Sequence, residues 1–124
     1  MNLKHVALVC SSEEKADRFF ADVLGCRKNE PRILPRTLSQ ALFKVDADLK
    51  IVKYQGESTV WELFIHKAGA SPKVRIEHVC IEVSDPHAVL TKCRDHGLEI
   101  RQVPKGEKII TLIADYDGNL FELT

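Results

Sequence analysis

Apolar and polar residues alternate in two runs of the sequence that resemble each other. The first run is His5-Val6-Ala7-Leu8-Val9-Cys10 and the second is His78-Val79-Cys80-Ile81-Glu82-Val83. Alternation with a period of two predicts a strand whose apolar face packs on the core. Each run begins with a histidine on the opposite face. The sequence therefore predicts a duplicated unit in which each first strand turns one histidine away from the core.

A helical pattern follows each of these strands. The first helix is predicted over residues 12–24 and stops at Gly25, and the second is predicted over 85–96 and stops at Gly97. Glycine commonly ends a helix because it adopts the left-handed conformation without strain. The adjacent pair Phe19-Phe20 falls on the apolar stripe of the first helix, so both rings are predicted to lie in the core.

Three further strand patterns complete each half of the chain. They are predicted at 26–34, 49–54 and 59–66 in the first half, and at 98–103, 108–115 and 119–124 in the second. Each half thus has the order strand, helix and three strands, which predicts an α+β fold of two βαβββ modules. We place these modules at 1–67 and 74–124 of a single domain covering 1–124, joined by a linker at 68–73 that contains Gly69 and Pro72.

One segment of the first half, residues 31–47, has no counterpart in the second. A short helix from Thr37 to Phe43 is predicted within it. Because this segment is additional to the repeat, it is the best candidate for a lid or a partner surface.

The composition narrows the classes of partner. The chain has 124 residues, 44% of them apolar, and 18 basic residues balance 18 acidic ones. Such a chain can fill a core but has no net charge to attract a phosphate backbone or an anionic membrane, so we expect a small-molecule substrate, no nucleic acid and no membrane. No secretory signal is expected, which favours a cytoplasmic protein with reduced, buried thiols at Cys10, Cys26, Cys80 and Cys93.

The last strand of each half carries one carboxylate on the face opposite its apolar residues. These are Glu62 and Glu122, and they match the histidines of the first strands, His5 and His78. Two imidazoles and two carboxylates provide nitrogen and oxygen donors for a divalent first-row metal ion and leave coordination positions for water or substrate. A metal would also offset the cost of placing a carboxylate among apolar neighbours.

These features resemble the vicinal oxygen chelate superfamily over the whole chain apart from residues 31–47. The resemblance rests on the ending Asp-Tyr-Asp-Gly-Asn-Leu-Phe-Glu-Leu, on the two His-Val openings and on the duplicated order of elements. It implies that the modules curl their sheets around a cupped cavity and that His5, Glu62, His78 and Glu122 bind the metal. This set looks most like that of bacterial glyoxalase I, which implies nickel, cobalt or zinc, with iron or manganese as further options.

The resemblance implies a lyase or isomerase that moves a proton next to a carbonyl of a small oxygen-chelating substrate. Either Glu62 or Glu122 can serve as the base, and we favour Glu122 because its strand ends two residues later. Three alternatives stay open: an enzyme like methylmalonyl-CoA epimerase, an iron-dependent dioxygenase using three of the four ligands, and a metal-free protein that binds small molecules, as bleomycin-resistance proteins do.

The thiol substrate and the assembly are less well defined by the sequence. No cationic cluster for a glutathione carboxylate can be assigned, although Arg27, Arg32, Arg36 and Lys105 are candidates for the cavity mouth. We expect a homodimer, with the cavity completed either within one chain or by halves of two chains.

Overall fold

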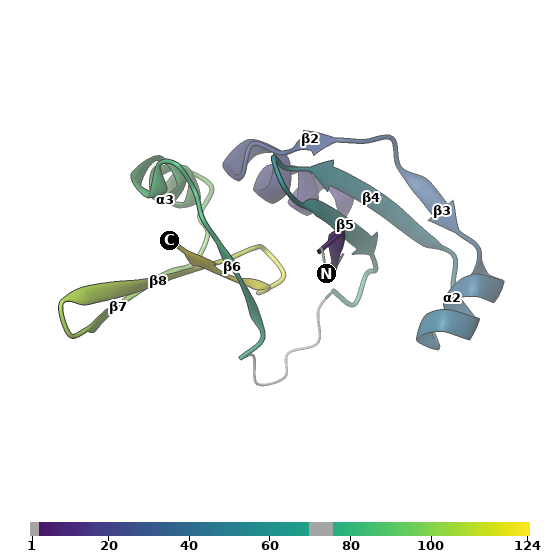
Figure 1. Cartoon of the computed structure of the whole chain (residues 1–124). Helices are drawn as coiled ribbons and strands as arrows, with labels where there is room; N and C mark the ends of the chain where they lie inside the picture. The colour runs from purple at the N-terminus through teal and green to yellow at the C-terminus, as the bar shows by residue number, and fades with distance from the viewer. Residues whose placement is uncertain (1–2, 70–75) are drawn as a thin grey trace.

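A computed structural model describes residues 3–69 and 76–124 as two mixed sheets with their helices (Figure 1). The first half contains β1 (His5–Cys10), α1 (Glu13–Ala16), η1 (Asp17–Val23), β2 (Arg27–Lys28), β3 (Arg32–Leu34), α2 (Arg36–Phe43), β4 (Leu49–Gln55) and β5 (Val60–Ile65). The second half contains β6 (His78–Ile81), α3 (Pro86–Asp95), β7 (Ile100–Lys105), β8 (Lys108–Ala114) and β9 (Leu120–Leu123). The predicted α+β fold with a repeated order of elements is confirmed.

Two predicted segments extend beyond the described residues. Residues 70–73 of the expected linker, and residues 74–75 at the expected start of the second module, lie outside the described residues. Within the described ranges, no helix is long and apolar enough to cross a membrane.

The two sheets have the same topology. The strand order is β1-β5-β4-β2, with β3 also paired to β4, in the first sheet and β6-β9-β8-β7 in the second. In both, the first strand runs parallel to the last, and the remaining pairs are antiparallel. Among the described strands, β1 pairs only with β5 and β6 pairs only with β9. Each sheet therefore presents its histidine-bearing strand at an edge.

The helical segment of the first half packs on both sheets. The ring of Phe19 lies 5.0 Å from that of Phe121 on β9, and the ring of Phe20 lies 5.7 Å from that of Trp61 on β5. Both phenylalanines are fully buried, as predicted. The predicted α-helix is, however, π-helical from Asp17 onward, with the Leu24 N–H donating to the Phe19 carbonyl five residues back.

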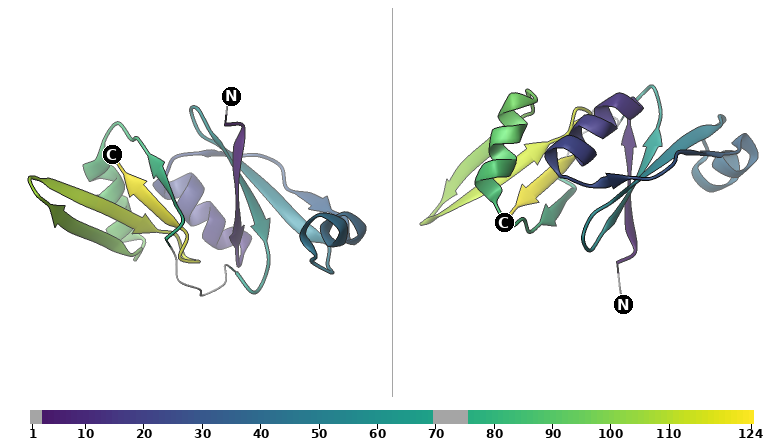
Figure 2. Two further views of the ribbon diagram at one scale, coloured as in Figure 1. Left: turned by 60° about the horizontal axis from the view of Figure 1, so that its bottom comes forward. Right: turned by 90° about the horizontal axis from the view of Figure 1, so that it is seen from above.

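This packing decides which faces of the sheets meet the core. The inner faces of both sheets contribute to one hydrophobic core. Since neighbouring residues of a strand point to opposite sides, the histidines of β1 and β6 lie on the outer faces. The two outer faces belong to separate sheets of one chain, which Figure 2 shows from two directions.

A set of hydrogen bonds also joins the two halves. The turn between β8 and β9 docks on the end of β1, where the Asn119 side chain donates to the Val9 carbonyl at 3.1 Å and the Ser11 N–H donates to the Asp117 carboxylate at 2.9 Å. The buried Asp115 accepts hydrogen bonds from the Asp117 and Asn119 backbones, and burial raises its pKa. We call this set of contacts the clasp.

The helix of the additional segment differs from its prediction at the start. α2 begins at Arg36, whose N–H donates to the Asp48 carboxylate at 2.7 Å, and Thr37 does not cap it. Leu38, Leu42 and Phe43 are each at least half exposed, and α2 lies at the far end of the first sheet, away from the second half (Figure 1). A role as lid or partner surface stays a prediction.

Candidate metal centre

His5 and Glu62 lie on the same outer face of the first sheet. In the parallel pairing of β1 with β5, His5 is opposite Val60 and Ala7 is opposite Glu62. Paired residues share a face, so Glu62 lies one pleat beyond the position opposite His5. The His5 side chain is exposed, whereas only 10% of the Glu62 side chain is exposed.

His78 and Glu122 repeat this arrangement on the second sheet. His78 is opposite Leu120 and Cys80 is opposite Glu122, so the glutamate again lies one pleat beyond the position opposite the histidine. Here the two side chains are in contact, with 3.4 Å between Nε2 of His78 and Oε2 of Glu122. The two halves thus place a histidine and a glutamate in equivalent positions.

The second pair brings one nitrogen donor and one oxygen donor close together. His78 Nδ1 lies 2.8 Å from the carbonyl oxygen of Ile76. A neutral imidazole that donates its Nδ1–H there has its Nε2 lone pair directed toward Glu122, and metal-binding histidines commonly make such a bond to a backbone carbonyl. An imidazole nitrogen and a carboxylate oxygen that converge in this way suit a bridging cation.

Glu62 contacts cations of its own sheet. Lys53 on β4 is directly opposite Glu62, and its Nζ lies 3.1 Å from Oε2. Arg32 on β3 approaches the same oxygen with Nη2 at 3.9 Å. Lys53 did not emerge as a site residue from the sequence, because only the strand register places it next to Glu62; Arg32 did emerge, as a candidate for the cavity mouth.

The two pairs do not come together within one chain. Among residues 3–69 and 76–124, no three histidine, cysteine or carboxylate side chains are grouped closely enough to hold a metal ion. One histidine and one glutamate provide two protein donors, whereas a catalytic site usually has three or more. The donor types therefore fit a divalent metal, and a full ligand set requires both pairs.

The cysteines correct one prediction. All four are free thiols, and Cys10 and Cys93 are buried as expected. Cys26 is half-buried and Cys80 is exposed, so the prediction of buried thiols is wrong for Cys80. The reason is strand alternation: Cys80 lies two residues after His78 and therefore shares its outer face.

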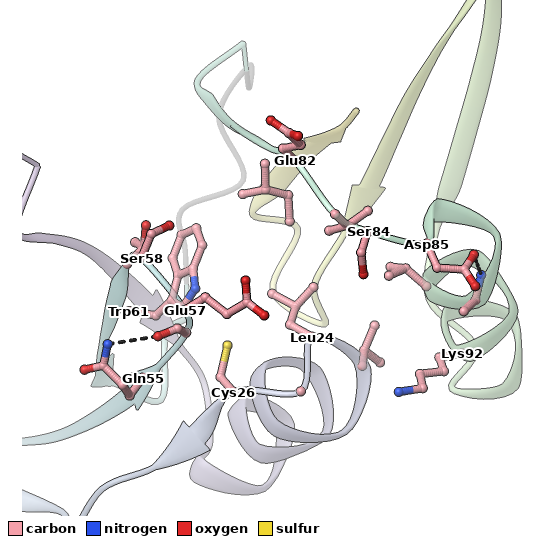
Figure 3. A pocket seen from close by; sticks show the side chains of 18 of the residues that line it. Leu24, Cys26, Gln55, Glu57, Ser58, Trp61, Glu82, Ser84, Asp85 and Lys92 are labelled. Atoms are coloured by element: carbon pink, nitrogen blue, oxygen red, sulfur yellow. Dashed lines mark hydrogen bonds between the residues drawn. The ribbon is translucent and has the colours of Figure 1, made fainter.

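A cleft of about 720 Å³ lies between parts of the two halves of the chain (Figure 3). One wall includes Cys26 and Trp61, and the other includes Ser84, Asp85 and Lys92. None of the four predicted metal ligands lines it. Cys80, which shares the outer face of His78, does line it, so the cleft reaches that face without including the ligands themselves.

Comparisons with known proteins agree with this fold. A sequence-family profile described as "Glyoxalase/Bleomycin resistance protein/Dioxygenase superfamily" matches residues 4–111. No curated protein matches the chain.

Solved structures match over nearly the whole chain. A glyoxalase family protein from Enterococcus faecalis is 20% identical with a TM-score of 0.72, and the match covers 98% of this chain and 95% of that one. Glyoxalase I of Leishmania major, described as trypanothione-dependent, is 20% identical with a TM-score of 0.69 and coverage of 99% and 85%.

A third solved structure contains a metal. It is a mutant of the fosfomycin resistance protein FosX from Listeria monocytogenes, complexed with Mn(II) and 1S,2S-dihydroxypropylphosphonic acid. It is 17% identical to this chain with a TM-score of 0.72, and the match covers 98% of this chain and 87% of that one. At these identities the three structures establish the fold.

Proposed function

Since the chain belongs to the glyoxalase/bleomycin resistance protein/dioxygenase superfamily, we propose that it is a metal-dependent, glyoxalase-like enzyme that moves a proton next to a carbonyl of a small oxygen-chelating substrate. The observation that carries this proposal is the equal offset from histidine to glutamate in the two sheets, His5 to Glu62 and His78 to Glu122. Four donors at equivalent places of a repeated unit are suited to one ion between two units.

The proposal includes a homodimer that completes each site. β1 and β6 are edge strands, and an edge strand presents unpaired backbone groups to another chain. If β1 of one chain lies beside β6 of its partner, the outer faces of the two sheets become continuous. His5 and Glu62 of one chain would then lie near the equivalent pair of the other, His78 and Glu122, and two sites would form per dimer.

The two glutamates have different surroundings, which supports different roles. The Glu62 side chain is nearly buried and lies against two cations, so it is suited to remain a fixed ligand. The Glu122 side chain, on the short final strand, is 30% exposed and contacts His78 of β6, so it has more freedom to move. We assign Glu122 as the base that takes a proton from one carbon and returns it to the neighbouring carbon.

The remaining chemistry needs no other reactant. A divalent metal bound by the four residues would act as a Lewis acid on the substrate oxygens and lower the cost of the negative charge next to the carbonyl. The proton that Glu122 removes is the proton that it gives back, so the substrate is isomerised without gain or loss of atoms.

The direct test combines metal analysis with an isomerase assay. Protein purified without chelator is analysed for nickel, cobalt, zinc, iron and manganese, and is then mixed with methylglyoxal and a series of thiols while thioester absorbance is followed. Fosfomycin is included as a separate substrate because FosX has a similar fold. We expect a bound divalent ion and thioester formation with at least one thiol.

Other results would favour the alternatives. Iron with oxygen-dependent cleavage of an aromatic ring would favour a dioxygenase. A protein that neither contains nor takes up any of these metals would contradict the proposal and favour a small-molecule-binding protein.

A further inference from the structure

Among the described residues, Glu62 is paired with basic side chains of its own sheet, whereas its counterpart Glu122 is paired with a histidine. Lys53 lies on β4, which pairs with β5, and Arg32 lies on β3, which pairs with β4; both approach oxygen Oε2 of Glu62. Glu122, in the matching position, contacts His78 instead. The half-site of the first sheet thus contains a carboxylate that lies next to positive charge before any metal arrives.

Burial explains why this carboxylate needs a cation. Only 10% of the Glu62 side chain is exposed, and the Trp61 and Leu63 residues on either side of it are buried in the core. An ionised carboxylate with so little access to water is costly unless an opposite charge or hydrogen-bond donors accompany it. Lys53, whose side chain is 35% exposed, supplies the nearer charge at 3.1 Å.

We propose that Lys53, assisted by Arg32, takes the place of the metal cation beside Glu62 in the metal-free protein, so that metal binding exchanges one cation for another at this carboxylate. This inference rests on the proposed function, because it takes Glu62 as a metal ligand. Lys53 is then a positioning residue: it holds the Glu62 carboxylate in an ion pair on the outer face until the metal arrives.

The exchange gives Lys53 two effects of opposite sign. Its charge stabilises the metal-free fold, and the same charge repels an incoming divalent ion and competes for the carboxylate. Loss of the charge should therefore lower stability without metal and increase metal affinity. A lysine with only a structural role would lower stability and leave metal affinity unchanged or weaker.

The same strand provides a matched control. Lys50 lies on the opposite face of β4, where its Nζ is 2.9 Å from Glu13 of α1. Its ion pair is similar in length to that of Lys53, but it faces the helix layer and not the candidate metal centre. Lys50→Met therefore removes a lysine–glutamate pair from the same strand without touching Glu62.

The experiment compares wild type, Lys53→Met and Lys50→Met as full-length protein. Thermal unfolding is measured in chelator and in zinc or nickel, and the metal dissociation constant is measured by competition with a chromophoric chelator. For Lys53→Met we expect a lower Tm in chelator, a larger rise of Tm on adding metal, and about tenfold tighter metal binding. For Lys50→Met we expect wild-type metal affinity.

Two further variants separate charge from fold. Lys53→Arg keeps the positive charge and should keep metal affinity close to that of wild type. Arg32→Met should change metal affinity in the same direction as Lys53→Met but by less, because Arg32 is more distant and 62% exposed. If Lys53→Met does not fold in chelator, Arg32→Met and Lys53→Arg still show how metal affinity depends on the positive charge beside Glu62.

The outcomes distinguish this inference from the function on which it rests. Metal affinity that is unchanged or weaker in Lys53→Met, with wild type binding metal, overturns the exchange and leaves the proposed enzyme intact. If wild type binds no metal, both proposals fail.

Discussion

The ring of Phe19 lies 5.0 Å from the ring of Phe121, and this contact joins the helix of the first half to the sheet of the second. Phe121 also lies 5.4 Å from Trp61, so its ring is surrounded by aromatic groups from the first half. Both halves of the chain therefore depend on one aromatic cluster.

Truncation of Phe121 should destabilise both halves, and they should still unfold in one transition. Phe121→Ala removes a fully buried ring and leaves a cavity, so we expect a loss of about 3–5 kcal/mol in the free energy of unfolding. Urea unfolding followed by fluorescence and by far-UV circular dichroism provides the measurement, and the two signals should change in one transition. Leu42→Ala on the exposed face of α2 is the control and should change stability by less than about 1 kcal/mol. Two separate transitions in the wild type would contradict a shared core.

The two glutamates should respond differently to replacement. Glu62→Gln is expected to weaken metal binding but to recover part of its activity when metal is saturating, because Glu122 remains. Glu122→Gln should lose activity by about a hundredfold or more even at saturating metal, because a carboxamide cannot carry the proton. Steady-state rates measured over a series of metal concentrations check this. Glu107→Gln, in the exposed turn of the β7–β8 hairpin, is the control. Equal recovery of both variants would contradict the assignment of the base.

Mixed dimers test whether a site is shared between chains. One chain carries His5→Ala with Glu62→Gln, the other carries His78→Ala with Glu122→Gln, and neither forms a complete site with itself. If sites form across the dimer, each mixed dimer has one intact site, and random mixing should restore about a quarter of the wild-type activity. Metal analysis of the purified mixed dimer should give one ion per dimer. No activity and no bound metal after verified mixing would exclude a shared site.

The ion pairs of Glu13 should make a contribution to stability that depends on pH. Hydrogen bonds from Lys28 and then Lys50 lower the pKa of Glu13 below its ordinary value of 4.5. A carboxyl whose pKa is lower in the folded state stabilises the fold above its unfolded pKa, and this contribution disappears as the pH falls through the folded pKa. Glu13→Gln should therefore be less stable than wild type at pH 7, and the difference should shrink as the pH is lowered below 4.5. Denaturant unfolding at a series of pH values measures this difference in the free energy of unfolding, with Glu107→Gln as the control. A difference that is constant with pH would contradict the prediction.

Alternation and repetition in the sequence predicted much of the fold. The runs that begin at His5 and His78 predicted β1 and β6, and the pair Phe19-Phe20 predicted the buried helix face. These predictions succeeded because a strand or helix with one buried side leaves a periodic apolar pattern. The π-helical winding of η1 was not predicted, since the spacing of apolar residues does not distinguish it clearly from an α-helix over two turns.

The candidate site was predicted less completely than the fold. Alternation placed the histidines and glutamates on outer faces, but the exposed position of Cys80 was missed although the same rule applies to it. The contact of Lys53 with Glu62 depends on the register between β4 and β5, and the sequence of one strand does not determine its register against another. The sharing of one ion by the four predicted ligands stays a prediction.

The clasp and the shared core have a consequence for the proposed dimer. Each chain would give its first half to one site and its second half to the other, while Asn119 and Phe19 hold those halves as one body. A shift of one half when substrate binds would then be transmitted through the chain to the distant site. The two catalytic centres would communicate, and binding curves with a Hill coefficient different from one would be the natural behaviour of such an assembly.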